Sequence, residues 1–316
     1  MPKFAFFSIT SVWQSLRFRP RLWLSILGAL LLGAFILTQF PNPFVNPPPH
    51  IRTGDQPFGY DALSYYLARA GSYQNNLTTS GLGAWRYAPF WLPLLAVAQQ
   101  LPFTVFAYLF SGLELAALAY LTRRWVLVAI LFVPVCLELY EGNIYLVSAA
   151  LLIFILTHTR RYPALASLWS FYFLTKVTPF LLLSWYLFRR EWRPLAWALG
   201  ATSSILVLGL LIDPHTWTAW LSSLITTQTI PDYAPLGLGL PWRLALALGL
   251  VAFGARTNRT VFLVPALLLT MPAIWWHTYS ILIAFFAAQC LDQAVRKPAP
   301  TPKNLLAPAE TSIIEA

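Results

Sequence analysis

The sequence predicts an all-α protein, a polytopic transmembrane helical bundle, on the strength of its composition and of its recurring apolar runs. Of the 316 residues, 58% are apolar and only 10% are charged, against about 25% charged in an ordinary soluble domain. Such a composition excludes a disordered chain and argues against a soluble globular enzyme. Because one span needs about 20 residues, the chain has room for roughly eight to ten crossings joined by short loops.

The expected helices follow from the lengths of these apolar runs, since a fully apolar helix shows no useful periodicity. Several runs are short and have Pro or Gly at their ends, which indicates broken or half-depth helices. The first run has basic residues before it and no A-x-A site after it, so we expect an uncleaved anchor. A further run at 89–101 is short, and we expect a partial or interfacial insertion there. Apart from 89–101, the runs are 22–39 (the first run), 103–122, 125–139, 143–158, 163–175, 178–188, 195–212, 241–255, 260–272 and 277–291.

The net charge of +10 comes from short basic clusters that lie between the apolar runs. No compact basic domain holds them, so they indicate membrane topology and no nucleic-acid partner. Placing these clusters in the cytoplasm, with the N-terminus, leaves two long loops, 40–88 and 213–240, on the external face. The segment 62–73 predicts an amphipathic helix on that surface. We therefore expect one integral membrane domain over 1–295, in a plasma (inner) membrane, and a disordered cytoplasmic tail over 296–316.

No motif of a soluble enzyme is present. The sequence lacks a Walker A loop, a dinucleotide-binding glycine pattern, an HExxH pair and a CxxC pair. Four His and two scattered Cys do not favour a zinc site. We expect neither a metal nor another cofactor.

Asp61 is the first candidate for chemistry, in the segment GYDALSYY. As a structural residue it would cap the helix that follows, since Asp before a helix accepts backbone N–H bonds. As a functional residue it would be a carboxylate at the membrane surface that takes a proton from a sugar hydroxyl.

Two basic residues are candidates for binding phosphate. Arg86 stands among aromatic residues in WRYAPFW, where it could extend to the headgroups or grip a phosphate bidentately. Lys176 lies in FLTKVTPF between two apolar half-helices. A lysine within a membrane run is costly and suggests a function by default, and a lipid phosphate would supply its anionic partner.

Four other polar residues interrupt apolar sequence. Glu141 and Asn143 form a polar break that is either a plain turn or part of an external site. His277 is either a hydrogen-bonded residue of the interfacial belt or a proton acceptor or phosphate ligand. Glu114 reads as a neutral, hydrogen-bonded residue of a helix interface, with a proton pathway as the alternative.

Taken in order, these positions resemble glycosyltransferase family 87, membrane enzymes of the GT-C type that use polyprenyl-phosphate sugars. The similar elements run from about residue 55 to 290. They are Asp61 with Tyr65 and Tyr66, the stretch 87–93, the Leu101-Pro102 pair, the turn 142–145, the Lys176–Pro179 turn and the element 271–279. The chain departs from the family pattern at Asn143, Tyr145 and Thr278.

The resemblance implies a role for each matching residue. Asp61 would be the general base, and Arg86 and Lys176 would hold the phosphate of the leaving group. His277 would lie near the acceptor or that phosphate. The resemblance also implies a substrate pocket formed by Tyr65, Tyr66, Glu141, Asn143 and Trp275.

The sequence therefore favours an inverting, metal-independent hexosyltransferase that moves a hexose, for example mannose, to a lipid or glycan acceptor on the external face. A transporter or lipid flippase is a second reading, although no internal repeat and few intramembrane charges support it. A non-catalytic membrane subunit descended from such an enzyme is a third, kept open by the departures from the family pattern.

Overall fold

A computed structural model describes residues 60–68, 73, 87–226 and 237–296, and these residues form helices and connecting turns with no strand among them. The helices of the first half are α3 (Tyr60–Tyr66), η1 (Pro89–Trp91), α5 (Leu92–Ala98), α6 (Phe103–Thr122), η2 (Arg123–Trp125), α7 (Val126–Ile130), α8 (Val133–Glu141) and α9 (Tyr145–His158). They are followed by η3 (Pro163–Trp169), α10 (Ser170–Thr175), η4 (Thr178–Leu183), α11 (Ser184–Phe188), α12 (Trp192–Ile212) and α13 (Pro214–Thr226). The last are α14 (Leu240–Thr257), η6 (Thr260–Phe262), α15 (Leu263–Leu269), η7 (His277–Ile283) and α16 (Ala284–Arg296). The predicted all-α class is confirmed for the described residues.

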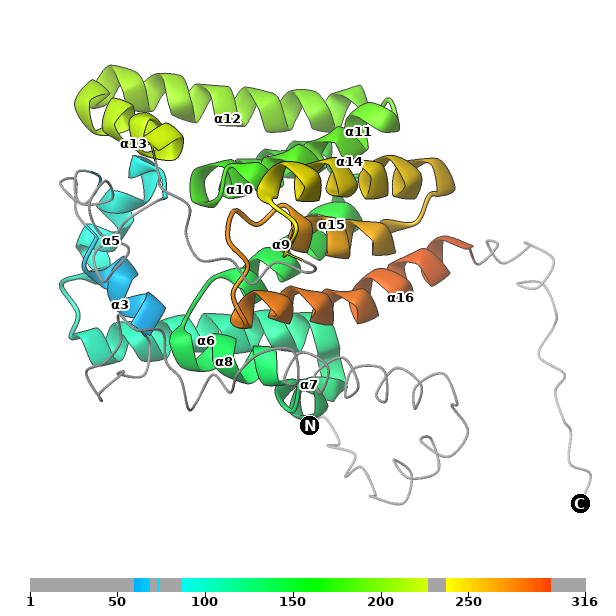
Figure 1. The fold of residues 1–316 in the computed structure, drawn as a ribbon, viewed down its shortest axis with the longest axis horizontal. Coiled ribbons are helices and arrows are strands. Elements are labelled where there is room, and N and C mark those ends of the chain that lie inside the picture. Colours follow the sequence, from blue (N-terminus) through cyan, green and yellow to red (C-terminus); the bar gives the residue numbers. More distant parts are fainter. Residues whose placement is uncertain (1–59, 69–72, 74–86, 227–236, 297–316) are drawn as a thin grey trace, which may run out of the picture.

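Two of these helices are long and apolar enough to cross a membrane, namely α6 and α12, and a third candidate is the bent pair of α8 and α9. Figure 1 shows α12 along one long edge of the molecule and α6 along the opposite edge. Their outer residues are apolar and exposed, as with Leu211 at 74% and Ile212 at 82%. Exposed Leu and Ile in such numbers suit contact with lipid, not water.

Most of the remaining predicted runs that the structure describes form helices that are interrupted part-way, and the run 22–39 lies outside the described residues. The run 125–139 is divided between α7 and α8, and the run 163–175 between η3 and α10. Proline stands at the first or second position of η3, η4 and α8, where its missing N–H removes no intrahelical bond. The expected broken helices are therefore present.

The core between the long helices is apolar and aromatic. α6 packs against α9, α12 against η3, and α14 against α15. The largest fully buried side chains include Trp169, Tyr172 and Tyr186. Their polar atoms are paired, because the Tyr172 hydroxyl donates to the Ser148 carbonyl oxygen at 2.6 Å and the Tyr186 hydroxyl donates to Thr159 at 3.0 Å.

Two sequence-based expectations for the long loops differ from the structure. The helix expected over 62–73 is not continuous, because α3 ends at Tyr66 and the chain turns at Leu67; residues 69–72 lie outside the described residues. The Ala68 carbonyl oxygen accepts a bond from the Gln99 side chain at 2.9 Å, which supports the chain where it leaves the helix. The segment 213–240, expected as a loop, contains α13. This helix begins because the Asp213 carboxylate accepts the Thr216 backbone N–H at 3.1 Å, an N-cap bond.

Candidate active site

A sharp turn between α8 and α9 is the centre of the candidate site. The axes of the two helices differ by 109°. Gly142 ends α8 with φ 71° and ψ 57°, a left-handed conformation that favours glycine because it has no Cβ. The bend places polar side chains, those of Glu141 and Asn143, in the middle of apolar sequence.

Glu138 fixes this turn from inside the protein. Its Oε1 atom accepts the backbone N–H of Tyr145 at 2.5 Å and that of Leu146 at 3.2 Å. These are orphan donors of the first turn of α9, so the carboxylate caps that helix from the preceding one. Glu138 is itself fully buried.

Asp61 reaches the turn from α3. It stands in the first turn of that helix, and its Oδ2 atom accepts a hydrogen bond from the Asn143 side-chain amide. The helix-cap role considered from the sequence is therefore not the contact that orients this carboxylate. Burial raises the pKa of Asp61 above its usual value, against the lowering effect of His277 and Lys176.

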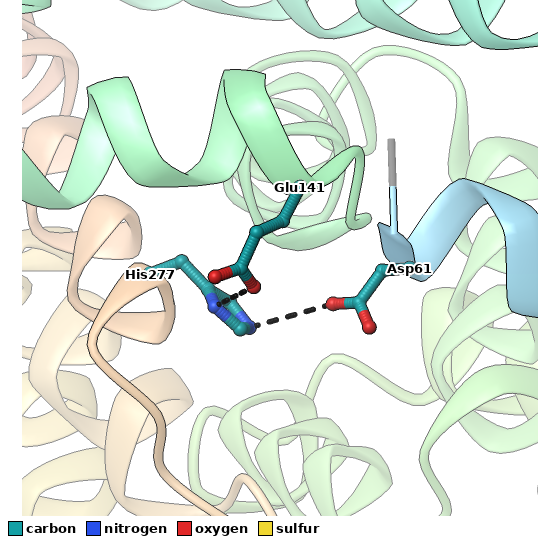
Figure 2. A group of neighbouring side chains, drawn as sticks. All are labelled: Asp61, Glu141 and His277. Carbon is teal, nitrogen blue, oxygen red and sulfur yellow. Dashed lines mark ion pairs between the residues drawn. The ribbon is translucent and has the colours of Figure 1, made fainter. Parts of the chain in front are cut away.

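His277, at the start of η7, completes the cluster, and Figure 2 shows its ring between the two carboxylates. Its Nδ1 atom lies 2.6 Å from Oε2 of Glu141, and its Nε2 atom lies 3.7 Å from Oδ2 of Asp61. Three segments that are far apart in the sequence thus meet at one point. Burial lowers the pKa of His277, but Glu141 and then Asp61 outweigh this effect and raise the pKa to about 9.

The orientation of the Asn143 amide determines the tautomer of the neutral imidazole. The Oδ1 atom of Asn143 accepts the Ile144 N–H at 2.8 Å and the Tyr65 hydroxyl at 2.9 Å. Its amino group therefore faces Asp61 and the Nε2 atom of His277, the latter at 3.3 Å. In the neutral ring Nε2 is then the acceptor and Nδ1–H donates to Glu141. A second proton on Nε2 would break the Asn143 contact and pair with Asp61.

Lys176 lies next to Tyr145, the first residue of α9, two residues after Asn143. The chain is extended at Lys176, with φ −143° and ψ 95°, directly after α10. Its Nζ atom donates to the Tyr145 hydroxyl at 2.8 Å, and it lies 4.3 Å from the Tyr145 ring centroid and 5.7 Å from that of Tyr87. The lysine charge is therefore held among aromatic rings near the carboxylates.

Asp61, Glu141 and His277 could together hold a metal ion, since one ligand atom from each lies within 4.8 Å of the others. However, the 2.6 Å separation of Nδ1 and Oε2 is that of a direct hydrogen bond. The two atoms point at each other and not at a shared ion. A metal would require this pair to open.

The other predicted site residues have different positions. The Tyr65 hydroxyl bonds Asn143 and also lies 3.1 Å from the Tyr87 hydroxyl, so Tyr65 is part of the cluster. The Tyr66 hydroxyl instead donates to the Leu101 carbonyl oxygen at 2.8 Å, at the start of α6. The backbone N–H of Trp275 donates to Thr278 at 2.9 Å, just before His277. Arg86 lies outside the described residues.

Four residues that the sequence did not single out as site residues support the cluster. Glu138 caps α9, and Tyr87 and Tyr145 flank Lys176. Arg243 is fully buried in α14, and its guanidinium donates to carbonyl oxygens at positions 238, 271 and 272, at 3.1, 2.8 and 3.3 Å. It thereby anchors the segment that leads to His277. Glu138 and Arg243 could have been found from the sequence, because each is a charged residue within an apolar run.

Glu114, on α6, differs from its expected role. It is fully buried as expected for a residue of a helix interface, but both of its carboxylate oxygens have no hydrogen-bond partner among the described residues. It is not part of the contacts that join the cluster.

The fold and the site together define an apolar helical membrane protein with a polar, carboxylate-lined centre next to a lysine. The model of one family, "Glycosyltransferase family 87", matches residues 85–291. The chain belongs to this family, so it is a membrane glycosyltransferase, and the predicted resemblance is confirmed. Asp61 and Tyr65 lie before the matched segment. No curated protein and no solved structure matches the chain.

Proposed function

We propose that the chain is an inverting hexosyltransferase that takes its sugar, for example mannose, from a polyprenyl-phosphate donor. The acceptor is a lipid or glycan at the external face of the plasma membrane. The observation that carries the proposal is that Asp61, His277 and Lys176 come from three distant segments and meet around the turn at Gly142. A base and a fixed cation side by side are what a displacement at a phosphate-linked sugar requires.

Asp61 is the proposed general base. It removes the proton of the acceptor hydroxyl as the acceptor oxygen attacks the anomeric carbon of the donor. The bond between that carbon and the phosphate oxygen breaks, and its electron pair leaves with the polyprenyl phosphate. A single displacement of this kind inverts the anomeric centre.

His277 and Glu141 are proposed to assist the base. The Nε2 atom lies 3.7 Å from the Asp61 carboxylate, so after a small movement the protonated ring can pair with Asp61 and stabilise its ionised form. Glu141 holds Nδ1–H at 2.6 Å and stabilises the imidazolium that forms. The pKa of His277, raised to about 9, agrees with a ring that carries its second proton at neutral pH.

Lys176 is the proposed ligand of the donor phosphate, with Arg86 as a second cation. Negative charge builds on the phosphate as the bond to the sugar breaks, and a fixed ammonium stabilises that charge. Since these side chains supply positive charge, the proposed reaction is metal-independent. Tyr65, Asn143, Glu141 and Trp275, with Tyr66, are proposed to line the substrate pocket.

The proposed membrane arrangement has eight to ten crossings, most of them made by broken helices. One integral domain covers 1–295, its N-terminus is cytoplasmic and the tail 296–316 lies in the cytoplasm. Irregular backbone at membrane depth is tolerated where protein or water lines it. The turn at Gly142 and the extended chain at Lys176 are such places, because their backbone N–H groups donate to the carbonyl oxygens of Glu138 and Tyr172, both at 2.8 Å.

Donor binding tests the proposal. The purified full-length protein in detergent would be titrated with polyprenyl-phosphate mannose, with Asp61→Asn and Lys176→Ala alongside. We expect Asp61→Asn to keep donor affinity and Lys176→Ala to weaken it about tenfold or more, since hydrogen bonds to charged groups contribute about 1.5–3 kcal/mol. Arg161→Ala is the control, because Arg161 is an exposed cation beyond the end of α9.

Two results would contradict the proposal. Equal donor affinity in all the variants would remove Lys176 as a phosphate ligand. No binding by the folded wild type would favour the alternatives of a transporter or a non-catalytic subunit.

A further inference from the structure

We propose that Tyr145 is a positioning residue for the donor phosphate, because it holds the Lys176 ammonium in place. This inference rests on the proposed function, in which Lys176 binds that phosphate. Tyr145 is 1% exposed and touches both halves of the site.

The contacts of Tyr145 on the lysine side are of two kinds. Its hydroxyl accepts a hydrogen bond from Nζ at 2.8 Å, and its ring centroid lies 4.3 Å from the same atom. A lysine ammonium is a point charge on a flexible four-carbon stem, so the stem alone does not fix its position. The hydroxyl and the ring face together restrict it to one place.

Tyr145 also packs against His277. The centroids of the two rings are 5.4 Å apart, with their planes at 32°. The same tyrosine side chain therefore contacts both the ammonium of Lys176 and the imidazole of His277.

The backbone of Tyr145 is fixed as firmly as its side chain. Its N–H donates to the buried carboxylate of Glu138 at 2.5 Å, and it is the first residue of α9. Helix, cap and ring thus form one rigid support for the lysine. A positioning role requires such rigidity, because a cation aids a transition state only if it is already in place.

The test compares binding of polyprenyl phosphate and of polyprenol, the same chain without phosphate. Tyr145→Phe keeps the ring and removes only the hydroxyl. We expect it to weaken polyprenyl-phosphate binding about five- to tenfold, the effect of about one charge-assisted hydrogen bond, and to leave polyprenol binding unchanged. A general loss of structure would weaken both ligands.

Tyr172→Phe is the matched control. Tyr172 is also 1% exposed, and its hydroxyl also bonds α9, through the Ser148 carbonyl oxygen at 2.6 Å. This variant should lose a comparable hydrogen bond without any change in the preference for phosphate. An equal loss of that preference in both variants would overturn the inference.

The double variant separates the inference from the proposed function. If Tyr145 acts through Lys176, then Tyr145→Phe should add nothing in the Lys176→Ala background. A wild-type affinity in Tyr145→Phe, with weak binding in Lys176→Ala, would overturn the inference and leave the proposed function standing. Unchanged binding in Lys176→Ala would contradict the proposed function itself.

Discussion

Replacing Glu138 by Ala should destabilise the turn that carries the candidate site. The change leaves two buried backbone N–H groups, of Tyr145 and Leu146, without the acceptor that they have at 2.5 and 3.2 Å. Both residues are at most 1% exposed, so water cannot easily replace the carboxylate. An orphaned buried donor costs about 1–3 kcal/mol.

One effect of the substitution stabilises the protein. The Oε2 atom of Glu138 has no hydrogen-bond partner among the described residues, and its removal relieves an unpaired buried acceptor. We therefore expect a net loss of about 2–4 kcal/mol in the free energy of unfolding. For a chain of 316 residues, with an unfolding entropy of about 2.1 cal/mol/K per residue, that corresponds to about 3–6 °C in Tm.

The assay is thermal unfolding in detergent, followed by tryptophan fluorescence. Glu138→Gln keeps an amide oxygen that can accept the same N–H groups, so its Tm should fall by much less. Glu191→Ala is the control: its ion pair with Arg189, at 2.7 Å, is partly exposed and should contribute less than about 1 kcal/mol. A Tm for Glu138→Ala equal to that of the wild type, or for Glu138→Gln equal to that of Glu138→Ala, would refute the reasoning.

Three further predictions concern the same region. Gly142→Ala should lose about 1–2 kcal/mol in the free energy of unfolding, because φ at this residue is 71°. The control Gly200→Ala should lose none, because a Cβ there meets open space within a helix, and melting curves of the two variants would be compared. Sugar transfer should fall as the pH drops and Asp61 takes up a proton; because burial raises the pKa of Asp61, this loss should begin at a higher pH than for an ordinary Asp. A pH profile with its acidic limb at the ordinary Asp value would contradict this. Arg243→Leu should lose about 3 kcal/mol, since it leaves buried carbonyl oxygens without their donors, and a wild-type Tm would contradict it.

The sequence was sufficient to predict the class of fold because composition decides it. The run at 103–122 corresponds residue for residue to α6, since a long apolar run with Glu114 as its one charged residue has no competing structure in a membrane. The position of the turn at Gly142 was also readable, because polar residues and a glycine interrupt two apolar runs. Its 109° bend was not, since packing of the two helices sets that angle.

The sequence brought forward Asp61, Asn143, Lys176 and His277 one at a time but could not show that they meet. Their proximity depends on how α3, the Gly142 turn and η7 pack, which is tertiary information. The break of the predicted helix 62–73 at Leu67 was not readable either, because Gln99, whose side chain binds the Ala68 carbonyl oxygen, is distant in the sequence.

The residues that support the site were harder to find than the site residues. Tyr145 and Tyr87 carry ordinary aromatic side chains in a sequence with 14 Tyr, so nothing local distinguishes them. Their role becomes visible only through their distances to the Lys176 ammonium.

Sugar transfer by the purified protein tests the central claim most directly. Polyprenyl-phosphate mannose with a labelled sugar would be incubated with the full-length protein and a membrane lipid extract as the source of acceptor. We predict labelled product with the wild type and a reduction of about 100- to 10,000-fold with Asp61→Asn, the usual contribution of a general base, while the variant keeps its Tm and its donor affinity. Undiminished transfer by a folded Asp61→Asn variant would contradict the account.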